Sequence, residues 1–149
     1  MATEDGLDDL SMVFAKVPFS RFPAWESLVR IGGGEENGTK YLELKVPQDG
    51  TDRFLYLSTA DNEITFGFDL WHTHFGPFLG LKTEDSVAQA IACIESFINQ
   101  ETVVTVCRRD GVWIESGLEY LVAPSALKPH STNEFFSWCR THDKTVNVP

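Results

Sequence analysis

The chain has 149 residues, of which 42% are hydrophobic and 12% aromatic, so it can bury a core without metals or disulfides. It has 22 acidic and 12 basic residues, and its net charge of −10 disfavours nucleic acid and anionic membranes as partners. No stretch approaches the roughly 18 consecutive apolar residues of a membrane span, and the acidic N-terminus lacks the basic start of a secretory signal. We therefore expect one cytoplasmic domain over residues 1–149, with an acidic flexible tail at 1–10 and a short polar tail at 142–149.

The cysteines support this expectation. Cys93, Cys107 and Cys139 lie far apart, inside apolar segments. The chain has no CxxC pair of the kind that binds zinc or takes part in thiol exchange. An odd number of separated cysteines predicts three reduced and largely buried thiols.

Prolines and glycines divide the segment after the acidic tail. The apolar run 10–17 is compatible with a short helix or an extended edge segment, and Pro18 is expected to interrupt it. Residues 24–30 have one apolar side, which predicts a short helix. Glycines and carboxylates over 32–38 predict a loop. This loop lacks the residue order of a phosphate-binding motif, so we expect no nucleotide or other cofactor.

Two strands follow this loop. Residues 40–46 alternate between Leu or Val and polar or charged side chains, which predicts a strand with one buried face. Asp49 and Gly50 are typical of a hairpin turn, and residues 53–58 are expected to return as a second strand. Residues 60–62 then turn the chain again.

The stretch 63–75, EITFGFDLWHTHF, predicts the central strand of the sheet. Read with a period of two, its buried face contains Ile64, Phe66, Phe68 and Leu70 and continues through His72 and His74. The opposite face contains Thr65, Gly67, Asp69 and Trp71. Because the three strands have short connections, they are expected to form an antiparallel meander.

The best predicted helix is 86–99, where Val87, Ile91, Ile94 and Ile98 recur at helical spacing. Thr83 or Asp85 is expected to cap it, and acidic residues suit its positive end. This helix needs a sheet face to cover its apolar side.

Three further strands are predicted after the helix. Residues 102–107 are rich in Val and Thr, and an Asp-Gly turn at 110–111 leads into a strand over 112–122, with a kink near Gly117. A proline-containing loop precedes a final strand over 134–141. The predicted fold is therefore α+β, with an antiparallel sheet of about six strands and one main helix on one face.

His72 and His74 are the sharpest candidates for chemistry. Two residues apart on one strand, their side chains should point the same way at roughly 7 Å, which suits two ligands of one metal. A metal-dependent enzyme or sensor centred on this pair is one hypothesis, and a structural or hydrogen-bonding role is the other. No HExxH or CxxC spacing supports zinc, and no nucleophile motif such as GxSxG is present. We therefore expect a protein without catalytic residues.

Aromatic residues suggest a binding surface. Tyr41, Tyr56 and Trp71 lie on predicted strands at positions outside, or flanking, the inferred core face. If the single helix leaves the other face open, these rings would combine with Asp69 and Glu43 into an acidic, aromatic surface suited to a protein partner. The alternative is a second core layer beneath the N-terminal segment.

The run EITFGFDLWHTHFGPF, the acidic-capped helix and the VVTVCRRDGVWIESG hairpin together resemble small cytosolic immunity proteins of bacterial polymorphic toxin systems. The likeness covers residues 40–141, and the FD-x-x-HTHF part is its most specific portion. It implies an acidic, non-catalytic single domain that binds a cognate toxin domain, often a basic nuclease, and blocks its active site.

Applied to this chain, the resemblance implies specific roles. Carboxylates such as Asp69, Glu43 and Glu115 would take the place of the toxin's anionic substrate, and Trp71 or Tyr56 would supply buried anchors. His72 and His74 would lie in the same partner-binding surface. The partner would be a basic toxin domain, and the oligomeric state remains open between monomer and homodimer.

Overall fold

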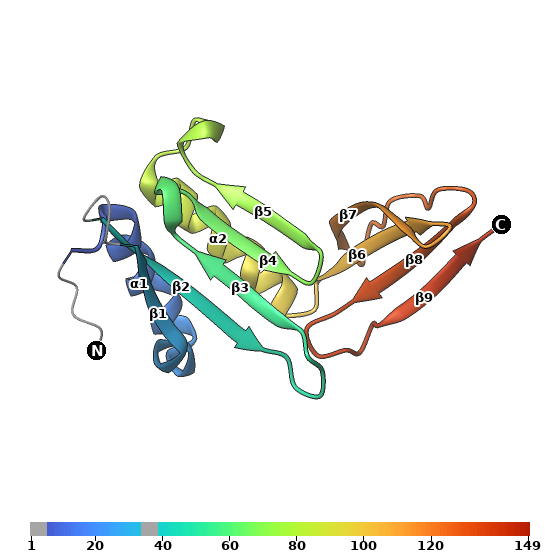
Figure 1. The fold of residues 1–149 in the computed structure, drawn as a ribbon, viewed down its shortest axis with the longest axis horizontal. Helices are drawn as coiled ribbons and strands as arrows, with labels where there is room; N and C mark the ends of the chain where they lie inside the picture. The colour runs from blue at the N-terminus through green and yellow to red at the C-terminus, as the bar shows by residue number, and fades with distance from the viewer. Residues whose placement is uncertain (1–5, 34–38) are drawn as a thin grey trace.

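The computed structural model describes residues 6–33 and 39–149, which form an α+β fold with two antiparallel sheets (Figure 1). The predicted fold class is confirmed. In place of about six strands in one sheet, the described residues form five strands in one sheet and four in the other.

The first sheet is a meander whose strands pair in chain order. Its strands are β1 (Val29–Gly33), β2 (Lys40–Pro47), β3 (Phe54–Ser58), β4 (Ile64–Phe68) and β5 (Trp71–Phe75). Alternation places one set of side chains in the core, as in β2, where Leu42, Leu44 and Val46 are buried as predicted. The Asp49-Gly50 hairpin connects β2 to β3, also as predicted.

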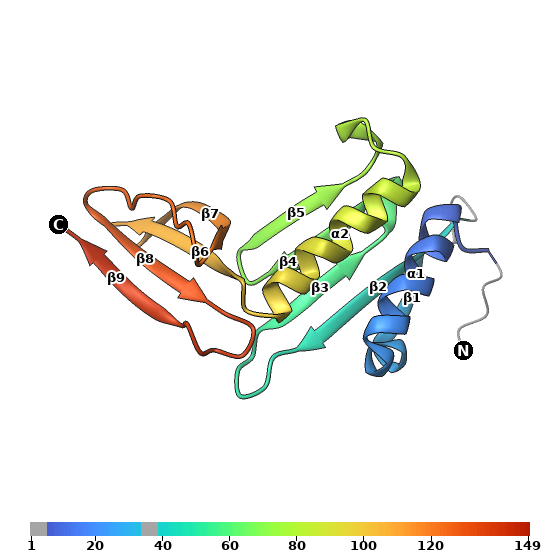
Figure 2. The ribbon, with the colours of Figure 1, turned by 180° about the vertical axis from the view of Figure 1, so that it is seen from behind.

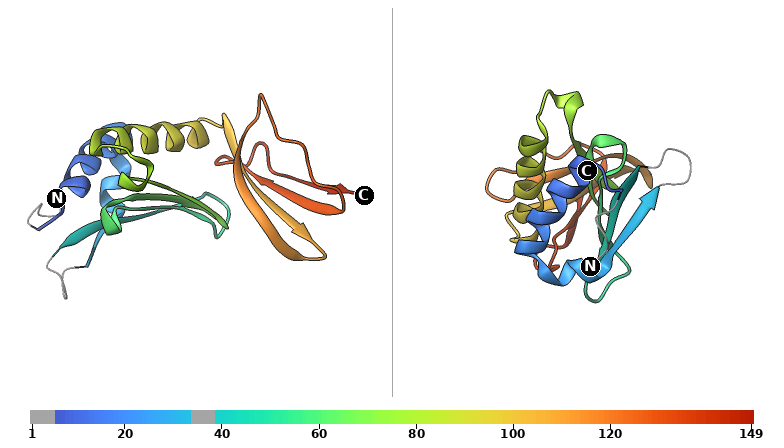
Figure 3. Two further views of the ribbon diagram at one scale, coloured as in Figure 1. Left: turned by 90° about the horizontal axis from the view of Figure 1, so that it is seen from above. Right: turned by 90° about the vertical axis from the view of Figure 1, so that its left-hand side faces the viewer.

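Two helices cover one face of this sheet, and no helix of the described residues lies on the other face (Figures 2 and 3). They are α1 (Asp9–Arg21) and α2 (Thr83–Ile98), and three short 3-10 helices complete the set: η1 (Pro23–Leu28), η2 (Ala60–Asn62) and η3 (Pro77–Leu79). The predicted apolar stripe of α2 is buried against the sheet. Its N-cap is Lys82 and no side chain caps it, so the predicted cap at Thr83 or Asp85 is wrong. Among the described residues, no helix is long and apolar enough to cross a membrane.

The second sheet has the order β7-β6-β8-β9. Its strands are β6 (Thr102–Arg109), β7 (Val112–Tyr120), β8 (Ser131–Phe136) and β9 (Lys144–Val148). The Asp-Gly turn between β6 and β7 has φ values of 51° and 76°, as a tight hairpin of this type requires. The irregularity in β7 lies at Ile114, opposite the step from Cys107 to Arg108, and not at Gly117.

The C-terminal end of α2 lies where the two sheets meet (Figure 3), and aromatic contacts join the sheets there. The ring of Phe97 lies 4.9 Å from Phe68 in the first sheet and 6.1 Å from Trp138, which follows β8. Gln48, next to β2, is buried and donates hydrogen bonds of 2.9 and 2.7 Å to the carbonyl oxygens of Ser137 and Trp138. The sheets are therefore fixed by both apolar packing and buried hydrogen bonds.

The predicted central strand 63–75 is a hairpin, not one strand. Asp69, with φ of 55°, and Leu70 form a two-residue turn, and Phe68 pairs with Trp71 across it. This turn exchanges the parity of the faces, because paired residues point to the same side. Leu70 is consequently 47% exposed, and the histidines of β5 lie on the face away from the core.

The N-terminal region is more ordered than predicted. The run 10–17 belongs to a helix, α1, which contains Pro18 and continues to Arg21. Asp8 accepts a hydrogen bond from the Ser11 amide at 2.7 Å and caps this helix, so the described part of the predicted tail is structured. The predicted helix 24–30 is the 3-10 helix η1 followed by β1. The predicted loop 32–38 begins inside β1 at Gly32 and Gly33, and its residues 34–38 lie outside the described residues.

The C-terminal region also differs. The predicted strand 134–141 is β8, which begins earlier and ends at Phe136. The predicted polar tail 142–149 contains β9, an edge strand whose Thr145 and Asn147 point to solvent. Cys139 is exposed, so only Cys93 and Cys107 are buried or partly buried thiols.

We expect Phe97→Ala to lower the free energy of unfolding by about 3–5 kcal/mol, because this ring fills the junction between the sheets. Phe78→Ala, at a mostly exposed phenylalanine of η3, is the matched control and should change stability by less than about 0.5 kcal/mol. Urea denaturation measures both values. Equal losses in the two variants would contradict the role assigned to Phe97.

The cysteines should differ in reactivity. Burial in α2 raises the pKa of Cys93 to about 11, so this thiol stays protonated at pH 8. We expect Cys139 to react with iodoacetamide first and Cys93 to react much more slowly in the folded protein. Mass spectrometry of peptides from timed labelling measures the order, and early modification of Cys93 would contradict it.

Candidate binding face

The uncovered side of the first sheet, here called the open face, forms the candidate site. Its side chains pair across β1 to β5 in one register. They are those of Arg30, Tyr41, Glu43, Lys45, Phe54, Tyr56, Ser58, Thr65, His72 and His74, with Gly67, which has no side chain, among them. Both α1 and η1 pack on the core side with α2, through Phe14 and Trp25. The alternative of a second core layer beneath the N-terminal segment is therefore wrong.

Tyr56 lies at the centre of the open face. It pairs with Lys45 on one side and Gly67 on the other, and its hydroxyl donates to Glu43 Oε1 at 3.3 Å. Partial burial raises the pKa of Tyr56, and the negative charge of Glu43 raises it further. The phenol therefore keeps its proton and remains a hydrogen-bond donor.

A cleft of about 460 Å³ opens beside Tyr56. Gly67 forms its floor because it has no side chain, and a Cβ there would approach the Cβ of His72 to 3.2 Å. Phe54, Tyr56, Thr65 and His72 supply side chains around it. The cleft combines aromatic surface with polar groups, as binding sites on sheets commonly do.

Asp69 and Arg53 close one end of this cleft. The Arg53 Nε lies 3.6 Å from Asp69 Oδ1, and the guanidinium of Arg53 stacks 4.1 Å from the ring centre of Phe136 in the second sheet. The carboxylate is thereby positioned by the turn and by a cation that is itself held by an aromatic ring. Asp69 is partly exposed, so the pair is only weakly stabilising.

His72 and His74 lie side by side as predicted, with ring centres 5.1 Å apart and planes nearly perpendicular. The Nδ1 of His74 is 2.8 Å from Glu63 Oε1 and 3.0 Å from Thr65 Oγ1. Within residues 6–33 and 39–149, no group of three His, Cys, Asp or Glu side chains is arranged to hold a metal. The observed contacts fit the hydrogen-bonding role better than the metal-ligand role.

Two predicted site residues lie elsewhere. Trp71 is 9% exposed and packs edge-to-face on Phe66 at 5.3 Å, so it belongs to the core because the hairpin turn reversed the parity. Glu115 lies on β7 of the second sheet, where it pairs with Lys128 at 2.8 Å. Trp71 therefore lines the cleft, while its ring packs in the core, and Glu115 lies outside the open face.

Phe54 is a functional candidate that the sequence reasoning missed. It is 42% exposed, and the ammonium of Lys45 lies 4.9 Å from its ring centre. The signal was available, because Phe54 alternates with Tyr56 on a predicted strand and must therefore share its face.

The open face is not acidic, contrary to prediction. Acidic and basic side chains are interspersed on it and at its rim: Glu43, Glu63 and Asp69 with Arg30, Lys45 and Arg53. Comparisons of the chain with protein families, curated proteins and solved structures found no match. The geometry of the face is therefore the basis for a functional conclusion.

We expect protein purified without a histidine tag to contain only substoichiometric metal, and His72→Ala to leave that content unchanged. The reason is that the histidine pair has no third ligand among the described residues. Elemental analysis measures this directly. Stoichiometric zinc, nickel or copper that disappears in His72→Ala would restore the metal hypothesis.

Proposed function

We propose that this chain is a non-catalytic binding protein whose partner docks on the open face. More specifically, we propose the role of the family that the sequence resembles: a cytoplasmic immunity protein that binds a cognate toxin domain and occludes its active site. The observation that carries the proposal is the aromatic cleft on a sheet face that no helix covers within residues 6–33 and 39–149.

The aromatic side chains support this role energetically. Phe54 and Tyr56 expose ring surface on neighbouring positions of one strand, where the backbone is already fixed. Burial of such rings gains apolar contact at a low cost in conformational entropy. Because interface energy concentrates in a few aromatic and arginine side chains, these two rings are the expected anchors.

The charges support a basic partner in two ways. Glu43 and Asp69 are each held in place, by Tyr56 and Arg53 respectively, so they can meet cationic groups without large rearrangement. The net charge of −10 adds a long-range attraction that raises the association rate with a basic domain. In the proposed complex, Glu43 and Asp69 occupy the place of the toxin's anionic substrate. Glu115 is left out of this role because it lies on the other sheet.

Co-expression with the toxin domain encoded beside its gene tests the proposal. We expect growth to be restored and a stable complex to be purified from the same cells. A toxin that stays fully active in the presence of folded, soluble wild-type protein would end the immunity proposal.

The docking face is tested with the double variant Phe54→Ala, Tyr56→Ala. We expect it to bind the toxin domain at least about 30-fold more weakly, because removal of anchors of this type costs about 2 kcal/mol or more. The matched control is Val112→Ala, Trp113→Ala, which removes two exposed apolar side chains from β7 of the second sheet. Calorimetry on purified proteins measures both affinities. If the control weakens binding and the open-face variant does not, the partner docks elsewhere.

A further inference from the structure

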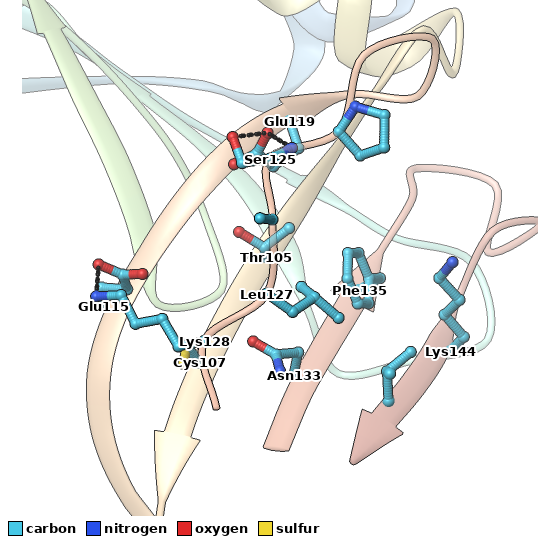
Figure 4. A pocket seen from close by; sticks show the side chains of 13 residues that line it. Thr105, Cys107, Glu115, Glu119, Ser125, Leu127, Lys128, Asn133, Phe135 and Lys144 are labelled. Carbon is cyan, nitrogen blue, oxygen red and sulfur yellow. Dashed lines mark hydrogen bonds and ion pairs between the residues drawn. The ribbon is translucent and has the colours of Figure 1, made fainter. Parts of the chain in front are cut away.

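The second sheet contains a pocket that the proposed function does not use (Figure 4). The loop 121–130 crosses the face of this sheet that carries Thr105 and Asn133, and encloses about 240 Å³ beneath it. Two contacts tie the loop down. Glu119 accepts hydrogen bonds from the amide and hydroxyl of Ser125 at 3.2 and 3.0 Å, and Lys128 pairs with Glu115 at 2.8 Å.

Asn133 lies in the floor of this pocket and is 5% exposed. The hydroxyl of Ser131 donates its one proton to the Lys128 carbonyl at 2.6 Å, so it can only accept from the Asn133 amide nitrogen, at 2.9 Å. This chain of bonds fixes the orientation of the amide. In the part of the protein that the structure describes, Asn133 Oδ1 accepts no hydrogen bond, so this oxygen is available to water or to a ligand in the pocket.

Opposite charges lie on the two sides of the pocket. Glu119 projects from β7 and Lys144 from β9, with Phe135 of β8 between them (Figure 4). The ammonium of Lys144 lies 4.9 Å from the Phe135 ring centre. Over the described ranges, neither Glu119 nor Lys144 has an ion-pair partner. An adjoining cavity of about 310 Å³ shares all three residues and extends the same groove.

We propose that this pocket binds a zwitterion of the size of one amino acid, with an apolar side chain. Its ammonium group meets Glu119, its carboxylate meets Lys144, and its side chain lies against Leu127 and Phe135. Asn133 pairs with Cys107, four positions along β6 from the partner of Glu119, so it does not share the ammonium contact. The part of the groove beneath the loop, about 240 Å³, is smaller than pockets for drug-sized ligands, which usually exceed about 300 Å³. The site lies on the second sheet, so the inference does not rest on the proposed function.

Calorimetry with L-leucine and L-phenylalanine tests the inference on the full chain. L-Leucinamide lacks the carboxylate and N-acetyl-L-leucine lacks the ammonium group. We expect leucine or phenylalanine to bind, and each leucine analogue to bind about tenfold more weakly than leucine, because each loses a charge-assisted contact. No heat from either amino acid, or equal binding of leucine and its analogues, would overturn the proposal.

Two conservative variants assign the charges. Lys144→Gln should remove the preference for leucine over leucinamide, and Glu119→Gln should remove the preference for leucine over N-acetyl-leucine. Glu119→Gln keeps an oxygen that can accept from Ser125, so the loop anchor is preserved. The matched control is Lys82→Gln, at an exposed lysine before α2, which should bind leucine as the wild type does. Retention of both preferences in the variants, with unchanged thermal unfolding, would also overturn the proposal.

Discussion

The packing of Phe97 is the constraint on which the rest of this structure depends. Its ring contacts Phe66 and Phe68 of the first sheet and Trp138 beyond the second, so one side chain at the end of α2 joins both sheets. The helix α2 covers the first sheet and leads directly into β6 of the second. Because it does both, it lies on only one side of the first sheet. The open face follows directly from this connection, because α1 is also used on the covered side.

Side chains on the open face are held in place by the hydrogen-bonded backbone of the first sheet. Tyr56 and Gly67 are paired residues of adjacent strands, so the ring and the floor of the cleft are fixed by the backbone ladder. Asp69 sits at the turn that ends the same hairpin and is held by Arg53, which stacks on Phe136 of the second sheet. The junction between the sheets therefore also positions the charged end of the cleft. Preorganisation of this kind lowers the cost of binding.

Much of this arrangement is readable from the sequence, because alternation and helical spacing are local signals. The burial of β2 and β4 and the position of α2 followed from such patterns. The face of Trp71 could not be predicted in the same way. The turn at Asp69-Leu70 contains no glycine, so the period of two runs through it without a visible break, and one turn exchanges every later side chain between faces.

The location of Glu115 and the existence of β9 depend on long-range packing. A short polar strand such as β9 is stabilised by its pairing with β8, which no local pattern reports. Likewise, nothing near Glu115 in the sequence indicates that its strand belongs to a second sheet. The prediction of an acidic open face was wrong for a related reason. The excess of acidic residues in the whole chain does not indicate where the basic residues lie in the fold.

The distribution of charge separates what governs encounter from what governs affinity. The excess of acidic residues belongs to the whole chain, whereas the open face interleaves Glu43 and Asp69 with Lys45 and Arg53. A face with both acidic and basic side chains binds a partner tightly only when the partner's charges are in complementary positions. The reason is that like charges placed opposite each other cost energy. In the complex that we propose, the net charge attracts basic proteins in general, and the charge pattern around Tyr56 selects among them. In this proposed complex, the exposed rings supply most of the binding energy and the fixed charges determine how the partner is oriented.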